Sequence, residues 1–241
     1  MEENKLEIPE EMVDELENLK GDESITLLDV KEEIKNEKEE NILLTPKILK
    51  ERCIGKNSEF SAIYDYTDEK GKTIFQIVKT INGRQPYYGR IPSRSGDYEY
   101  KIPRDLKLVP YNLPSINKAI KEETPIWLVE GESKADTINK LGFIATTVAF
   151  KSAYKFTEEY AEFFQGAKAI IIMADNDARG EEFAEHSKEV IKGTLEETEV
   201  ATIRVNEICS NIKSGGDIDD LIELFGEDSI KATLETIESQ F

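Results

Sequence analysis

The chain has 241 residues, of which 39% are hydrophobic and 34% are charged, a composition typical of a globular protein with some solvent-exposed segments. Acidic residues outnumber basic residues by 50 to 31, and the formal net charge of −19 disfavours a polyanionic partner unless positive charge is gathered locally. The apolar runs are too short to cross a bilayer, and the acidic start of the chain does not resemble a secretory signal. We therefore expect a cytoplasmic protein without a membrane partner.

The charge is unevenly distributed and divides the chain into three predicted regions. Residues 1–45 have a net charge of −11 and no aromatic residue, which predicts an acidic, partly disordered tail. The alternative is an acidic arm that competes with nucleic acid for the basic region or docks a partner. Residues 46–121 have a net charge of +7 and are predicted to form a small, basic, β-rich subdomain. Residues 122–241 have a net charge of −15 and are predicted to form an α/β domain that ends in helices.

The middle region begins with a helix signal and continues with a strand pattern. Thr45 and Pro46 suit the N-cap and the first position of a short helix, which is expected to end near Gly55. Two runs of β-branched and aromatic residues follow, and they predict a hairpin of residues 61–66 and 73–80 with Gly71 in its turn.

After the hairpin, arginine and lysine residues are interleaved with tyrosines. Cationic side chains neutralise phosphates, and tyrosine rings stack on unpaired bases. A tyrosine-rich hairpin with a solvated edge is the alternative interpretation. The segment is a candidate contact surface for single-stranded DNA or nucleotides, formed by Arg84, Tyr87, Tyr88, Arg90, Arg94, Lys101 and Arg104.

The last region alternates short apolar runs with helical patterns, which is typical of a parallel sheet flanked by helices. Strands are predicted at residues 126–129, 145–149, 169–173 and 199–205, and helices from about 132 to 141, 157 to 164, 179 to 193, 217 to 225 and 228 to 239.

Carboxylates follow two of the predicted strands directly. Glu130 comes after the first strand, and Asp175 and Asp177 come after the third. Because open α/β sheets bind ligands at the carboxyl ends of their strands, these three side chains are expected to converge. Mg²⁺ prefers one or two carboxylates together with waters and phosphate oxygens. A further acidic group contains Asp217 and Asp219, although stabilisation of a helix dipole alone would also account for it.

In order and spacing, these residues resemble the Toprim domain, the metal-dependent fold shared by bacterial-type primases, topoisomerases and some nucleases. Residues 126–131 resemble the family's strand and characteristic glutamate, and residues 170–180 resemble its Asp-x-Asp motif with the following glycine. The similarity covers about residues 122–225. Residues 64–71 and 84–100 also resemble the region that precedes the Toprim domain in primases and primase–helicase proteins of phages and plasmids. This wider similarity covers about residues 60–225 and favours a primase over a topoisomerase.

The resemblance implies a role for each carboxylate. Glu130 would be the acid/base or metal-orienting group, and Asp175 and Asp177 would hold Mg²⁺ or Mn²⁺ at a nucleoside triphosphate or a 3′ end. Asp217 and Asp219 would form a second metal site. Primases of this type synthesise short primers on single-stranded DNA, and this chain would work with a replicative helicase or other replication protein supplied separately.

The sequence departs from the family in three ways. Relatives usually have an aspartate four residues after the motif glutamate, where this chain has Lys134, so a metal ligand is lost unless Glu132 or Asp136 replaces it. Two widely separated cysteines and one histidine cannot form the zinc-binding domain of primases. The sequence also contains no phosphate-binding loop of a helicase ATPase.

Two other functions fit the same residues. A Toprim nuclease would use the metal site for phosphodiester cleavage, with Glu130 as the base. A non-catalytic module would bind nucleic acid or a replication partner, and Lys134 would then reflect lost activity. A topoisomerase is the least favoured alternative, because strand passage needs further domains and a separate tyrosine nucleophile.

Overall fold

The computed structural model describes residues 60–80, 88–90, 107–149 and 156–241. The chain divides into two units, residues 1–41 and 42–241, and every described element belongs to the second. The predicted acidic tail and the predicted helix ending near Gly55 lie outside the described residues. In the part of the chain that the structure describes, no helix has the length and apolar character needed to span a membrane.

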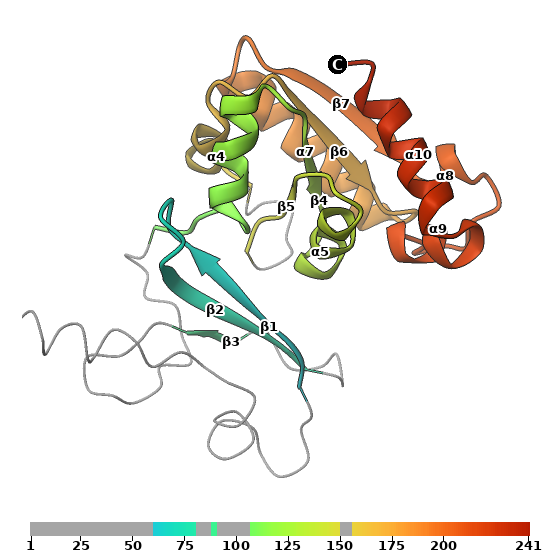
Figure 1. The fold of residues 1–241 in the computed structure, drawn as a ribbon, viewed down its shortest axis with the longest axis horizontal. Helices are drawn as coiled ribbons and strands as arrows, with labels where there is room; N and C mark the ends of the chain where they lie inside the picture. Colours follow the sequence, from blue (N-terminus) through green and yellow to red (C-terminus); the bar gives the residue numbers. More distant parts are fainter. Residues whose placement is uncertain (1–59, 81–87, 91–106, 150–155) are drawn as a thin grey trace, which may run out of the picture. The chain divides into compact units, whose positions relative to one another are not determined.

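An antiparallel three-stranded sheet comes first in the described chain (Figure 1). Its strands are β1 (Phe60–Thr67), β2 (Thr73–Thr80) and β3 (Tyr88–Arg90), in the order β1-β2-β3. Gly71 adopts a φ of 83° in the turn between β1 and β2, a conformation that favours glycine. The predicted hairpin is therefore confirmed, whereas β3 was not predicted.

The second sheet has four parallel strands in the order β5-β4-β6-β7. Every residue of the two central strands is buried, because helices cover both faces of the sheet. The strand β5 is shorter than the sequence predicted, although the residues after it remain buried. The strands are β4 (Ile126–Val129), β5 (Ala145–Thr146), β6 (Ala169–Ala174) and β7 (Glu199–Arg204).

Among the described residues, eight helical segments surround or follow this sheet, and two of them, α4 and α8, were not predicted. The helices α4, α6 and α7 share one buried cluster with the inner face of the β1–β2 hairpin. A second cluster on the opposite face of the sheet involves α5, α9 and α10, and Figure 1 shows α9 beside α10. The segments are α4 (Leu113–Glu122), α5 (Glu132–Lys140), α6 (Glu158–Ala161), the 3-10 helix η3 (Glu162–Phe164), α7 (Ala178–Thr194), α8 (Val205–Ile208), α9 (Ile218–Phe225) and α10 (Glu227–Glu238). The predicted fold class, a parallel sheet flanked by helices, is confirmed.

Candidate functional site

Glu130 and Asp175 leave neighbouring parallel strands at the same edge of the sheet. Val129 of β4 is in register with Met173 of β6, so the loops that follow both strands start side by side. Gly131 adopts a φ of 103°, which favours glycine, and it lies directly before α5. The structure thus brings together the loops that carry the glutamate and the Asp-x-Asp motif.

Asn176 joins the loop that carries the Asp-x-Asp motif to the loop that precedes α9. Its backbone N–H donates to the Gly216 carbonyl at 2.9 Å, and its own carbonyl accepts from the Gly215 N–H at 2.8 Å. Its side-chain amide donates to the carbonyls of Ile212 and Lys213. Sequence reasoning missed Asn176, although asparagine often organises turns by bonding nearby backbone groups. These bonds bring the start of α9 close to the end of β6.

Gly180 allows the first turn of α7 to approach Asp175 closely. A Cβ atom at this position would lie 2.6 Å from both the backbone nitrogen and the backbone oxygen of Asp175. Because those are backbone atoms, they cannot rotate away as a flexible side chain would. Glycine is therefore required here by contact with the site rather than by its backbone conformation.

Two of the predicted metal-binding aspartates also cap helices. Asp177 Oδ1 accepts from the backbone N–H groups of Arg179 and Gly180 at 2.9 and 2.8 Å, at the start of α7. Asp217 Oδ1 accepts from the N–H groups of Asp219 and Asp220 at 3.0 and 3.3 Å, at the start of α9. Both caps use a single carboxylate oxygen, and no hydrogen bond or ion pair among the described residues engages Oδ2 of Asp177.

Lys134 lies among the predicted metal-binding carboxylates. Its Nζ contacts Asp175 Oδ2 and lies 3.6 Å from Asp217 Oδ2. Burial alone would lower the pKa of Lys134, but the charges of Asp175, Asp217 and Glu130 outweigh it, and the pKa is raised. Burial raises the pKa of Asp175 to about 6 against the opposing attraction of Lys134, and the like charges of Glu130 and Asp217 add to that rise.

Neither Glu132 nor Asp136 takes the ligand position that Lys134 occupies. Glu132 is fully buried, and its Oε1 accepts a hydrogen bond from the Tyr66 hydroxyl at 2.9 Å. Asp136 Oδ1 accepts from the Tyr111 hydroxyl at 2.9 Å. These two carboxylates therefore join α5 to the hairpin and to the segment before α4.

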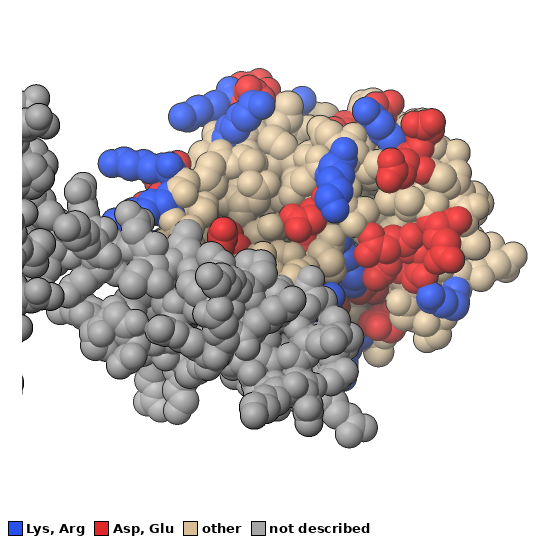
Figure 2. Space-filling view, turned by 60° about the horizontal axis from the view of Figure 1, so that its bottom comes forward, with Lys and Arg blue, Asp and Glu red and all other residues tan. Residues whose placement is uncertain are grey.

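The donor set suits Mg²⁺ in its chemistry, because Asp175 and Asp177 supply two carboxylates and such sites complete their coordination with water and phosphate oxygens. Among the described residues, no group of three acidic, histidine or cysteine side chains is arranged around one point to hold a metal ion. Asp219 Oδ1 accepts from the Thr137 hydroxyl at 2.6 Å. Figure 2 shows acidic side chains gathered on the side of the molecule where α9 lies.

The predicted nucleic-acid segment lies almost wholly outside the described residues. Only the backbone of Tyr88 and Arg90 is described, as part of β3. Nothing in the structure tests the predicted contacts of Arg84, Tyr87, Tyr88, Arg90, Arg94, Lys101 and Arg104.

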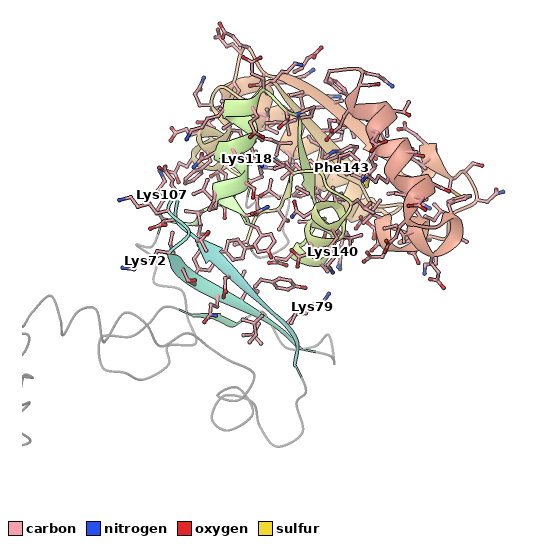
Figure 3. The ribbon with its side chains drawn as sticks, in the orientation of Figure 1. Lys72, Lys79, Lys107, Lys118, Lys140 and Phe143 are labelled. Carbon is pink, nitrogen blue, oxygen red and sulfur yellow. The ribbon has the colours of Figure 1, made fainter. Side chains whose placement is uncertain are left out.

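A lysine-lined pocket of about 820 Å³ lies between α4, η3 and the β1–β2 turn. Its lining includes Lys107, Lys118 and Lys121, and Figure 3 labels the first two. The Lys107 Nζ lies 4.9 Å from the centre of the Phe163 ring, which also lines the pocket. Sequence reasoning missed this pocket because it did not predict α4.

Residues 125–208 match the family model of the Toprim domain. The chain contains a Toprim domain. A search of curated proteins found no match. Among solved structures, the chain is similar to a DNA primase domain from Pseudomonas aeruginosa, with a TM-score of 0.54 and 18% identity over 90% of this chain and 60% of that one.

Two further solved structures resemble the chain. The DnaG catalytic core gives a TM-score of 0.51 and 17% identity over 72% of this chain and 52% of that one. The zinc-binding and RNA polymerase domains of the Aquifex aeolicus primase give a TM-score of 0.52 and 18% identity, over 72% of this chain and 39% of that one. The chain thus spans three fifths or less of these proteins and shares the fold of bacterial DNA primase domains. The predicted resemblance to the Toprim domain and to primases of the bacterial type is confirmed.

Proposed function

We propose that this Toprim protein is a primase-like nucleotidyltransferase that makes short primers on single-stranded DNA from nucleoside triphosphates. The proposal rests on the positions of Glu130 and Asp175, which directly follow neighbouring parallel strands at the same edge of the sheet. The backbone bonds of Asn176 bring the loop of Asp217 to this edge as well. Carboxylates at this edge of an α/β sheet suit a metal-assisted phosphoryl transfer.

Three of these acidic residues would have a role in the reaction. Asp175 and Asp177 would hold one Mg²⁺ or Mn²⁺ ion, which when bound neutralises charge on the transferring phosphoryl group. The oxygen of a 3′-hydroxyl bonds to the α-phosphorus, and the bond from that phosphorus to pyrophosphate breaks. Glu130 accepts the proton of the hydroxyl. Burial of Asp175 strengthens its interaction with a cation, because competing water is largely excluded.

The predicted partners follow from this role. Single-stranded DNA would contact the Arg84–Arg104 segment and the lysine-lined pocket, because both offer cations beside aromatic rings. A replicative helicase or another replication protein would act in trans. Both assignments are proposals, as is the division of the chain into an acidic tail, a basic subdomain and a catalytic domain at residues 45 and 121.

The experiment that tests the function is primer synthesis without a pre-existing primer. Labelled nucleoside triphosphates are incubated with single-stranded DNA, Mg²⁺ or Mn²⁺, and either wild type, Asp175→Asn or Asp228→Asn. Asp228 is exposed near the start of α10, so its substitution is a matched control for the loss of one carboxylate. We expect short products of discrete length from wild type and Asp228→Asn, and none from Asp175→Asn.

Other outcomes identify the alternative functions. A template that becomes shorter in a metal-dependent way would replace the synthesis proposal with the nuclease. If no product forms and the template stays intact, even with a replicative helicase present, both the primase and the nuclease hypotheses would be contradicted. DNA binding that survives Asp175→Asn under those conditions would identify a binding module.

A further inference from the structure

Lys134 occupies an unusual position for a lysine. It lies in the first turn of α5, where the positive end of the helix dipole disfavours a cation. Its side chain is only 12% exposed, and burial of an ammonium group is costly unless anions surround it. Both costs are offset by contact with Asp175 Oδ2 and by Asp217 Oδ2 at 3.6 Å.

The lysine lies between carboxylates that come from two different loops. Asp175 follows β6 and Asp217 precedes α9, and these loops are joined by the backbone bonds of Asn176. Two carboxylates brought this close repel each other unless a cation lies between them. In this chain a covalently attached ammonium supplies that positive charge.

Two aspartates of the site keep carboxylate oxygens for one exchangeable cation. Among the described residues, hydrogen bonds and ion pairs engage Asp175 through Oδ2 and Asp177 through Oδ1, so each aspartate keeps its other oxygen. Asp219 is bonded to Thr137, and Glu132 to Tyr66. The carboxylates that remain for one metal ion are therefore those of Asp175 and Asp177, and water and phosphate oxygens would complete its coordination.

We propose that the Lys134 ammonium takes the place of a second divalent cation between Asp175 and Asp217, so that this protein binds a single metal ion. The inference rests on the proposed function, because it assumes that Asp175 and Asp177 bind the first ion. It revises the prediction that Asp217 and Asp219 form a second metal site.

The test is the number of Mn²⁺ ions bound per full-length chain, measured by electron paramagnetic resonance of free Mn²⁺ in about 0.15 M salt, which weakens binding to scattered surface carboxylates. We expect one ion for wild type and two for Lys134→Asp, because the aspartate removes the fixed cation and adds a ligand. Lys134→Arg keeps the charge and should stay at one. Lys140→Asp makes the same charge change at an exposed position of α5 and should also stay at one.

The outcomes separate this inference from the proposed function. Two ions bound to wild type would overturn the inference and leave the first metal site intact. No ion bound to either wild type or Lys134→Asp would contradict the metal site of the proposed function, and the inference with it. One ion bound to a folded Lys134→Asp protein would show that the lysine does not replace a cation. If that variant does not fold, the wild-type stoichiometry alone decides between one ion and two.

Discussion

Burial and the charge of Lys134 change the pKa of Asp175 in opposite directions. Its side chain is 9% exposed, and burial raises its pKa from 3.8 to about 6 although Lys134 favours the ionised form. The folded protein therefore binds a proton at Asp175 over a pH range in which the unfolded chain has already lost it. The stabilising contribution of this group is full below the unfolded pKa and is lost as the pH rises through the folded pKa.

This shift predicts a pH-dependent difference between wild type and Asp175→Asn. We expect the free energy of unfolding of wild type, minus that of the variant, to fall by on the order of 2 kcal/mol as the pH rises from about 4 to about 7. Urea denaturation at several pH values without metal measures both quantities. A difference that rises with pH would mean that the ion pair with Lys134 outweighs burial and lowers the pKa.

Gly180 provides a second prediction at the residue scale. In Gly180→Ala, the new Cβ would lie 2.9 Å from the Asp175 Cβ as well as against its backbone, so the loop or the helix must move. We expect a loss of about 1–3 kcal/mol in the free energy of unfolding. We also expect weaker Mn²⁺ binding, measured by titration of the same protein.

The matched control lies in the same helix. Gly193 of α7 has no neighbouring atom within 4 Å of the position that a Cβ would take, so Gly193→Ala should be neutral or stabilise the helix by up to about 1 kcal/mol. Equal stability and metal affinity for the two alanine variants would show that the close approach at Gly180 is not needed.

At the scale of elements, the contact between β1 and α5 fixes the hairpin against the Toprim domain. Tyr66 and Glu132 are both fully buried, and the tyrosine ring also stacks on Phe75 with a centroid separation of 4.4 Å. The hairpin and the helix that follows the motif glutamate are thus coupled by a buried hydrogen bond. A change in this bond should affect the stability of both elements.

Tyr66→Phe tests that coupling because it removes the hydroxyl and keeps the ring. We expect the free energy of unfolding to fall by about 1–3 kcal/mol, since a buried carboxylate loses a donor. Tyr111→Phe removes a similar bond to Asp136, but both of those residues are only half-buried, so water can replace the hydroxyl and the loss should be smaller. Chemical denaturation measures both variants, and an equal or reversed order would contradict this account.

The strands that carry the site could be predicted, whereas the contacts between loops could not. The strands β4 and β6 are buried on both faces, so they form continuous apolar runs that end at Glu130 and near Asp175. The position of Lys134 between two aspartates depends on the tertiary bonds of Asn176, which no local pattern encodes. The helix α4 was not predicted, although its apolar residues recur at helical spacing and a proline lies in its first turn, as in many helices.

At the scale of the whole molecule, the distribution of charge decides whether an acidic protein can bind a polyanion. The net charge of −19 repels nucleic acid at long range, so binding has to depend on local groups of cations and on short-range attraction. Within the described residues, the pocket beside α4 gathers Lys70, Lys107, Lys118 and Lys121, with Glu69 and Glu162 also in its lining. The acidic cluster that contains Asp175 is formed by other elements, the loops after β4 and β6 and the start of α9.

This separation predicts a measurable effect on the salt dependence of DNA binding. In the double variant Lys118→Gln and Lys121→Gln, we expect weaker binding of single-stranded DNA and a salt slope that is smaller by roughly 1.4, because each phosphate contact contributes about 0.7 for a single strand. Fluorescence anisotropy of a labelled oligonucleotide at several salt concentrations measures both. Lys188→Gln with Lys192→Gln makes the same charge change on α7, away from the pocket lining, and should leave the slope nearly unchanged. Equal slopes for the two double variants would exclude the pocket as a phosphate contact and leave the Arg84–Arg104 segment as the candidate DNA surface.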